Sequence, residues 1–441
     1  MQNNQEKIPL WRQLQATAAV LASVWDGLSG TVAIDAVASN LRPGVQALAF
    51  HVWRNLGRAQ ALRKLLANKA PPVQVDALLC TALALAWNAS NVSYDAFTLV
   101  NQAVEAAKRN PQTRAQANFV NACLRRFLRE RDTLVSLTDS DLVAVWNHPQ
   151  WWILRLQTEY PTCWEAMLSA ANTQAPLTLR VNARRSTPSA YLDMLQTAGI
   201  EAKTNGRYGV DLVQAVAVQR LPGFSDGMVS VQDGAAQMAA PLLLQGLEGL
   251  KAPRLLDACA APGGKTGHLL ELSDARIVAL DIDAKRCLRI SDNLLRIQVD
   301  AEVLAADASY PEHWWDGKLF DGILLDAPCT ASGIVRRHPD VRWLRRETDV
   351  AQLALLQAKI LRALWPLLRP GGVLLFCTCS IFHAEGQDQV ETFLAHNTDA
   401  TLLPSPGHLA PHSGANWEDL QDNQVRDHDG FFYALLQKRM G

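Results

Sequence analysis

The sequence predicts a multidomain protein with an all-α N-terminal domain, a small α/β middle module and a C-terminal doubly wound α/β domain. Three observations predict this division. Residues 1–140 carry apolar side chains at three- and four-residue spacing, residues 145–235 mix helix-like and strand-like runs, and residues 236–441 alternate between the two. A chain of 441 residues is long enough for each part to have its own core.

Bulk composition is that of an ordinary folded protein. Hydrophobic residues make up 49% and charged residues 19% of the chain, and the formal net charge is -1, so any nucleic-acid binding must come from local basic patches. The eight cysteines have no framework spacing, which favours the reducing cytoplasm. The most apolar early run, Val73–Trp87, is too short to span a bilayer and contains Asp76, so we expect a buried helix and no membrane association.

In the N-terminal part, Pro43-Gly44 and Pro71-Pro72 separate predicted helices. Arg125 and Arg126 come at the end of an apolar helix. They form either a solvated helix face or a patch that contacts nucleic-acid phosphates.

The middle module begins with an alternating strand at Leu177–Asn182, which contains Arg180, and continues with a helix at Pro188–Ala198. Short strand-like runs follow around Ala202, Val210 and Val229. The sequence allows this module to be a spacer or an RNA-binding platform.

The C-terminal part predicts a parallel sheet. Its expected strands are Arg254–Cys259, Arg276–Asp281, Glu302–Ala306, Phe320–Asp326, Val373–Cys377 and Phe431–Leu436. Helices are expected at 284–297 and 347–368, the second broken by Pro366. In such sheets the ligand lies beyond the carboxyl ends of the strands, where the strand order reverses. We expect that point at the first strand, with the fourth and fifth on one side and the second on the other.

The loop Ala260-Ala-Pro-Gly-Gly-Lys-Thr266 follows the first strand. It lacks the G-x-G-x-x-G pattern of dinucleotide sites, and Cys259 stands where a phosphate-binding loop of the G-x-x-x-x-G-K-[ST] type needs glycine. A nucleoside ligand without a pyrophosphate remains, and S-adenosylmethionine is the commonest. Asp281 suits its ribose and Asp307 its adenine, although both also fit ordinary strand-end turns.

Two of the eight cysteines fall just past strand ends, at the same crevice: Cys329 and Cys379. The others lie in apolar helical or strand contexts, or at the loop: Cys80, Cys123, Cys163, Cys259, Cys287 and Cys377. A zinc site would need four soft ligands at recognisable spacing, and only Cys377-x-Cys379 is closely paired, so we expect no metal.

Two thiols at one site suit the methylation of cytosine at carbon-5. A thiolate that adds to carbon-6 makes carbon-5 nucleophilic toward a methyl sulfonium, which is covalent catalysis. A second thiol helps proton removal or product release. A carboxylate such as Asp326 would hold the amino edge of the ring and a proton on ring nitrogen-3.

Three motifs resemble those of the RNA cytosine-5 methyltransferases: Asp257-Ala-Cys-Ala-Ala-Pro-Gly-Gly-Lys265, Asp326-Ala-Pro-Cys329 and Thr378-Cys-Ser380. The helical part resembles the antitermination factor NusB, notably in Phe119-Val-Asn-Ala-Cys-Leu-Arg-Arg126. Further segments extend the likeness to the bacterial enzymes that act on small-subunit ribosomal RNA: Val229–Asp233, Arg336–Asp340 and Asp429–Tyr433. The resemblance covers nearly the whole chain.

This resemblance implies a Rossmann-like methyltransferase domain in which Cys379 is the nucleophile and Cys329 assists product release, and the chemistry of the ring adds Asp326 as a candidate catalytic residue. It implies that S-adenosylmethionine is bound by Cys259, Ala260, Ala261, Pro262, Gly263, Gly264, Lys265, Asp281, Asp307 and Asp326. The implied substrate is one cytosine in a hairpin loop of 16S ribosomal RNA, at position 967 in the usual numbering of that RNA, and we expect a monomeric enzyme. Cys377 departs from the family pattern, which has a small residue there.

Six arginines are the candidate RNA contacts: Arg125, Arg126, Arg180, Arg336, Arg337 and Arg342. The last three follow Cys329 closely, and a solvated loop is the alternative interpretation. Two other functions compete with RNA methylation. A non-catalytic, antitermination-like RNA-binding protein would not need both crevice cysteines, and a small-molecule or protein methyltransferase would not need two appended domains with arginine clusters.

Overall fold

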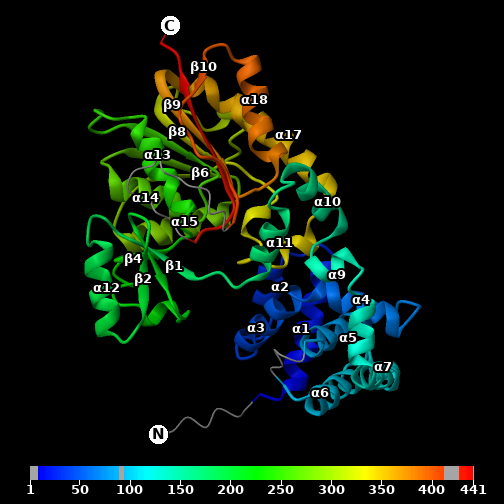
Figure 1. Ribbon diagram of the computed structural model, residues 1–441. Helices are drawn as coiled ribbons and strands as arrows, with labels where there is room; N and C mark the ends of the chain where they lie inside the picture. The colour runs from blue at the N-terminus through cyan, green and yellow to red at the C-terminus, as the bar shows by residue number, and fades with distance from the viewer. Residues whose placement is uncertain (1–7, 89–93, 412–426, 441) are drawn as a thin grey trace. The chain divides into compact units, whose positions relative to one another are not determined.

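The computed structural model describes residues 8–88, 94–411 and 427–440. They divide into two compact units (Figure 1). The first contains the described residues up to Thr173 together with Val335–Glu347, and the second contains Gln174–Ile334 and those from Thr348 onward. None of the described helices is both long enough and apolar enough to span a bilayer.

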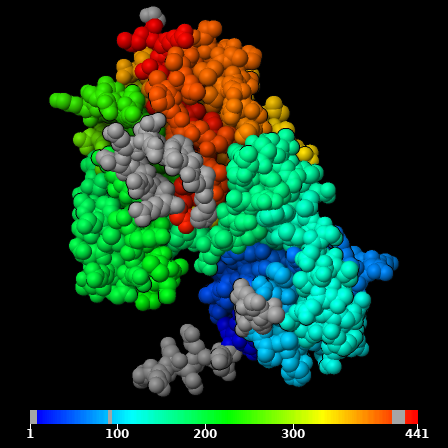
Figure 2. Space-filling model, viewed as in Figure 1, coloured from blue at the N-terminus to red at the C-terminus, as the bar shows by residue number. Residues whose placement is uncertain are grey.

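The described residues of the first unit contain helices and no strands, and buried apolar side chains between Leu14 and Leu134 form one core. Figure 2 shows the N-terminal residues of this unit in blue and cyan. The helices are α1 Leu10–Trp25, α2 Gly30–Asp35, α3 Arg42–Trp53, α4 Leu56–Leu66, α5 Val73–Ala86, α6 Ala96–Arg109, α7 Ala117–Arg129, α8 Arg131–Leu137, α9 Leu142–Trp146, α10 Gln150–Glu159, α11 Trp164–Asn172 and α16 Val341–Leu344. The apolar run from Val73 forms the central helix α5, which is buried from Ala77 onward and packs against α1 and α4, as predicted.

The second unit begins with a four-stranded antiparallel sheet of strand order β2-β3-β1-β4. Its elements are β1 Leu177–Val181, α12 Pro188–Thr197, β2 Ala202–Asn205, β3 Gly209–Leu212 and β4 Val229–Val231. Leu179, Val181 and Val210 of the sheet form a core with Tyr191 and Leu195 of α12. The strands and the helix of the predicted middle module are therefore present, whereas α10 and α11, which lie within the bounds that we gave that module, belong to the helical unit.

The larger sheet has the strand order β10-β12-β9-β8-β5-β6-β7, with β11 paired to β12. Its strands are β5 Arg254–Ala258, β6 Arg276–Asp281, β7 Glu302–Ala305, β8 Phe320–Asp326, β9 Leu368–Thr378, β10 Ala400–Leu402, β11 Gly407–Leu409 and β12 Phe431–Lys438. The five strands from β5 to β9 are parallel, and the order reverses at β5, as predicted. The antiparallel β12 closes one side of this parallel core.

Helices cover both faces of this sheet (Figure 1). They are α13 Ala239–Gln245, α14 Gly264–Leu272, α15 Ala284–Ile297, α17 Glu347–Leu364 and α18 Gln387–His396. Successive residues of each central strand alternate between two cores: Leu324 packs with α13, α14 and α15, and Leu325 with α17 and α18. Burial on both faces explains why these strands are continuous apolar runs in the sequence.

Two boundaries in the C-terminal domain differ from expectation by more than two residues. Helix α17 ends at Leu364, and a 3-10 turn at Trp365–Leu367 contains Pro366, which has no amide hydrogen to continue the helix. Strand β9 begins at Leu368, five residues early, because Leu368 pairs with Phe320 before an irregularity restores the register at Val373.

Candidate active site

The predicted cofactor loop lies between β5 and α14. Cys259, directly after β5, has a φ of 61°, and Gly263, which caps α14, has a φ of 89°. A Cβ at Gly263 would lie 3.0 Å from Cγ2 of Ile290, so both backbone conformation and space favour glycine there. The loop therefore turns tightly into the N-terminus of a helix, where backbone amide groups are available to a ligand.

Asp281, the last residue of β6, is buried against this loop. Its Oδ2 accepts a hydrogen bond from the Ala261 amide at 3.1 Å, and its Oδ1 accepts one from the Asp283 amide at 3.1 Å. These bonds hold an acidic side chain beside the loop, at the position that suits a ribose. Together with the loop backbone it fits a nucleoside cofactor.

Asp307 follows β7 and makes turn contacts of its own. Its Oδ1 accepts hydrogen bonds from the amide and hydroxyl groups of Ser309, at 2.8 and 2.7 Å. This is the local turn role that we considered as the alternative. Binding of adenine by Asp307 stays a prediction.

The two crevice cysteines are brought together by neighbouring parallel strands. Cys329 follows β8, Cys379 follows β9, and their Sγ atoms are 3.4 Å apart. Cys377 is fully buried within β9, as predicted for a core residue, with its Sγ 3.6 Å from Oδ1 of Asp326. Three thiols and a carboxylate therefore lie close together at the carboxyl ends of the adjacent strands β8 and β9.

An ion pair joins the cofactor loop to the end of β8. Lys265 Nζ, from the cofactor loop, donates to Asp326 Oδ2 at 2.7 Å. Burial lowers the pKa of Lys265, but Asp326 and the thiols of Cys377 and Cys379 raise it by more, so its net pKa lies above the ordinary value and the ammonium group persists.

The Cys329 thiol is held in its neutral form. Its pKa is raised well above the ordinary value by the hydrogen bond to Cys379, by burial, and by the negative charge of Cys379 and Glu385. Either sulfur can be the donor across the 3.4 Å contact, and a neutral Cys329 is able to donate its S–H to Cys379.

Glu385 joins the two cysteine loops and was not found from the sequence. Its carboxylate accepts hydrogen bonds from the amide of Thr330 at 2.8 Å, from the Thr330 hydroxyl at 2.5 Å and from the Ser380 hydroxyl at 2.6 Å. Gln357 of α17 donates a further hydrogen bond at 3.2 Å. Because Thr330 and Ser380 directly follow the two cysteines, this fully buried carboxylate fixes both thiols relative to each other.

Three of the six predicted RNA contacts are wrong, because their side chains are buried within the protein. Arg336 and Arg342 are 1% and 0% exposed, and Arg180 is 1% exposed. Arg342 donates to the carbonyl groups of Asn147 and Ala171 and to the side chain of Asn172. A guanidinium group that is enclosed in this way does not reach a phosphate.

For the remaining three arginines, contact with RNA stays a prediction that the structure does not test. Arg337 is half-buried. Arg125 and Arg126 are exposed on α7, where Arg125 donates to Asn121 and Arg126 pairs with Glu130.

Comparisons with known proteins agree with this geometry. Residues 245–437 match the family model of the 16S rRNA methyltransferase RsmB/F, residues 148–219 the RsmF/B-like ferredoxin-like domain, and residues 15–129 the NusB family. The ribosomal RNA small subunit methyltransferase B of Pseudomonas syringae pv. tomato is 40% identical over 438 residues, covering 96% of both chains. The chain belongs to the 16S rRNA methyltransferase RsmB/F family.

A second relative also matches this chain over nearly its whole length. The ribosomal RNA small subunit methyltransferase B of Vibrio cholerae is 37% identical over 434 residues, covering 96% of this chain and 97% of its own. Among solved structures, PH0851 has the same fold, with a TM-score of 0.73 at 22% identity, covering 96% of this chain and 99% of that one.

Membership of the RsmB/F family makes this protein an RNA methyltransferase that uses S-adenosylmethionine. The predicted fold class is confirmed in all three parts, and the middle module is ferredoxin-like. The family therefore supports the enzymatic interpretation over a non-catalytic RNA-binding protein.

Proposed function

We propose that this RsmB/F family enzyme methylates carbon-5 of one cytosine in 16S ribosomal RNA through a covalent adduct between Cys379 and carbon-6 of the base. The observation that carries this proposal is the pair of sulfur atoms 3.4 Å apart, in which the pKa of the Cys329 thiol is raised well above its ordinary value. By the family resemblance, the target is position 967. We also propose the cytoplasm as its compartment, which the free thiols suit.

In the first half of the reaction, Cys379 loses its proton to solvent and its thiolate adds to carbon-6, which breaks the carbon-5–carbon-6 π bond, while nitrogen-3 of the ring takes up a proton from solvent. Asp326 would accept hydrogen bonds from that proton and from the amino group, while Lys265 holds the carboxylate in place. S-adenosylmethionine, when bound, supplies the methyl group that carbon-5 of the adduct attacks. The target base must leave its stack to present this face, which suits a hairpin loop.

In the second half, carbon-5 must lose its proton before the carbon–sulfur bond to Cys379 breaks. Two of the causes that raise the pKa of Cys329 are the hydrogen bond to Cys379 and the charge of that residue. Both disappear once the sulfur of Cys379 is bonded to carbon-6, so the pKa of Cys329 falls in the adduct. A lower pKa lets Cys329 give up its own proton to solvent more readily, and the resulting thiolate then takes the carbon-5 proton. The electron pair left behind forms the carbon-5–carbon-6 double bond and expels Cys379 as a thiolate, and nitrogen-3 returns its proton to solvent.

The test compares three single variants with tritiated S-adenosylmethionine and 16S ribosomal RNA, followed by digestion to nucleosides and chromatography. We expect the wild type to yield 5-methylcytidine and Cys379→Ala to yield no labelled nucleoside. Cys377→Ala, which removes a buried thiol two residues away, is the matched control and should retain most of the activity. A different methylated nucleoside, or full activity in Cys379→Ala, contradicts the proposal.

A further inference from the structure

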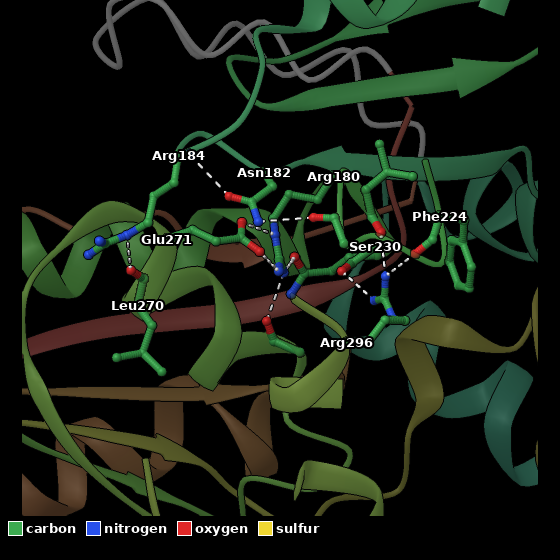
Figure 3. Close-up of polar contacts among 12 residues, drawn as sticks. Arg180, Asn182, Arg184, Phe224, Ser230, Leu270, Glu271 and Arg296 are labelled. Atoms are coloured by element: carbon green, nitrogen blue, oxygen red, sulfur yellow. Dashed lines mark hydrogen bonds and ion pairs between the residues drawn. The ribbon is translucent and has the colours of Figure 1, made fainter. Parts of the chain in front are cut away.

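Arg180 of β1 makes a buried ion pair with α14, the helix that follows the cofactor loop (Figure 3). Its Nε and Nη2 donate to the two carboxylate oxygens of Glu271 at 2.9 and 2.7 Å. Both side chains are 1% exposed. A bidentate pair of this kind fixes orientation as well as distance.

The same guanidinium group reaches the start of that helix. Its Nη1 donates to the carbonyl oxygen of Gly264 at 2.7 Å and to the side-chain oxygen of Gln232 at 2.5 Å. Gly264 is the first residue of α14, and Glu271 lies in its last turn. Between them, a Cβ at Gly267 would be in ordinary contact with Nη2 of Arg180, at 3.5 Å, but only 2.7 Å from Cδ1 of Ile297, so glycine is needed there for close packing against Ile297. One arginine therefore fixes both ends of α14 to the ferredoxin-like sheet.

Other contacts join the same two parts without touching the cofactor loop. Arg184 donates to the carbonyl oxygens of Leu270 and Ser273, at 2.7 and 2.6 Å, at the C-terminal end of α14 (Figure 3). Arg296 of α15 donates to the carbonyl oxygen of Phe224 at 2.9 Å and to the Ser230 hydroxyl at 2.8 Å. These bonds hold the ferredoxin-like module in place, and of these three arginines Arg180 is the one that hydrogen-bonds to Gly264, the first residue of α14.

We propose that Arg180 is a positioning residue for the S-adenosylmethionine site, so that the ferredoxin-like module acts in cofactor binding. It acts through the Gly264 carbonyl, which fixes the first turn of α14 and hence the direction of the loop amide groups that face the ligand. The neighbouring Lys265 is aligned by the same turn toward Asp326. This inference rests on the cofactor loop that we assign to residues 259–265.

The test uses Arg180→Lys, which keeps the charge but loses the forked geometry. We expect its dissociation constant for S-adenosylmethionine, measured by calorimetry, and its KM for the same cofactor to rise on the order of tenfold. Because Arg180 does not touch the thiols, kcat at saturating cofactor should change less than about threefold. Arg184→Ala is the matched control, since it removes bonds across the same junction, and its cofactor affinity should stay within about twofold of wild type.

A second variant separates loss of the Gly264 contact from misfolding. The double substitution Arg180→Gln with Glu271→Gln leaves no unpaired buried charge and still removes the contact with Gly264. It should show the same rise in the dissociation constant while its thermal unfolding remains cooperative. Wild-type cofactor affinity in a folded Arg180→Lys or double variant, or an equal loss in Arg184→Ala, overturns the proposal.

Asp281→Asn separates this inference from the assignment of the loop. If Asp281→Asn binds S-adenosylmethionine as wild type does, the assigned site itself is wrong. If Asp281→Asn loses binding while Arg180→Lys keeps it, only the role of Arg180 fails.

Discussion

The segment Val335–Glu347, which begins six residues after Cys329, is built into the helical unit, and Arg342 is its anchor. Arg342 is completely buried, and its guanidinium group donates to the Ala171 carbonyl at 2.6 Å and to the Asn172 side chain. Longer bonds reach the carbonyl groups of Asn147 and Val335, at 3.3 and 3.4 Å. The residue therefore links three separate stretches of chain, and we expect Arg342→Ala to destabilise the helical unit.

The size of this loss follows from the groups left without a partner. Each buried acceptor that loses its donor costs about 1–3 kcal/mol, so the two short bonds alone represent about 2–6 kcal/mol. Removal of a buried charge offsets part of this loss, because burial and the neighbouring Arg54 lower the pKa of Arg342 to about 9. A net loss of about 3 kcal/mol would lower the melting temperature of a unit of this size by roughly 6–12 °C.

The assay combines thermal unfolding with hydrogen–deuterium exchange of α11, which carries Ala171 and Asn172. Exchange of α11 should accelerate in Arg342→Ala. Arg125→Ala is the matched control, because Arg125 is exposed and its loss should change stability by less than about 0.5 kcal/mol. If Arg342→Ala instead unfolds like wild type and shows a smaller salt dependence of RNA binding, the residue contacts RNA and our correction is mistaken.

Three further changes have defined outcomes. Glu385→Gln should lower kcat on the order of tenfold or more without changing cofactor affinity, because it weakens the contacts that position the two thiols and does not touch the cofactor loop. Steady-state kinetics that show an unchanged kcat and a changed cofactor affinity would exclude this role. Burial raises the pKa of Asp257 to about 7, so ionisation favours the unfolded state and stability falls as pH rises from about 4 to 7. Asp257→Asn should remove up to about 4 kcal/mol of this pH-dependent loss in the free energy of unfolding. Urea unfolding at pH 4 and pH 7 measures the loss in the variant and the wild type, and an equal loss in both would contradict the prediction. The double variant Arg125→Ala with Arg126→Ala should weaken RNA binding and reduce its salt slope by up to about 2, and an unchanged slope would remove α7 from the RNA-binding surface.

The sequence was most informative where backbone geometry alone places residues together. Because parallel strands end at one edge of a sheet, the order of the strands was enough to bring Cys329 and Cys379 to one crevice. The same reasoning placed Asp281 beside the cofactor loop, and the hydrogen bond to the Ala261 amide agrees with it. Alternating burial on two faces made the central strands recognisable as continuous apolar runs.

Sequence reasoning failed where the destination of a side chain depends on distant packing. Arg180 and Arg342 looked like surface cations because arginine is usually exposed, and nothing local marks Glu271 or Asn172 as their partners. Glu385 gave no signal for the same reason, since its donors come from three different loops and helices. The sequence did not predict that residues 335–347 belong to the helical unit, because this short, charged segment has no apolar pattern that marks it as part of a helical core.

The central claim is the division of labour between the two thiols, and trapping the adduct tests it most directly. Cys329→Ala is incubated with 16S ribosomal RNA and S-adenosylmethionine, and the products are separated on a denaturing gel beside the double variant Cys329→Ala with Cys379→Ala. We predict a denaturation-resistant protein–RNA complex that carries the transferred methyl group in the single variant and no complex in the double variant. A complex that survives in the double variant, or its absence from an otherwise folded Cys329→Ala enzyme, would contradict this mechanism.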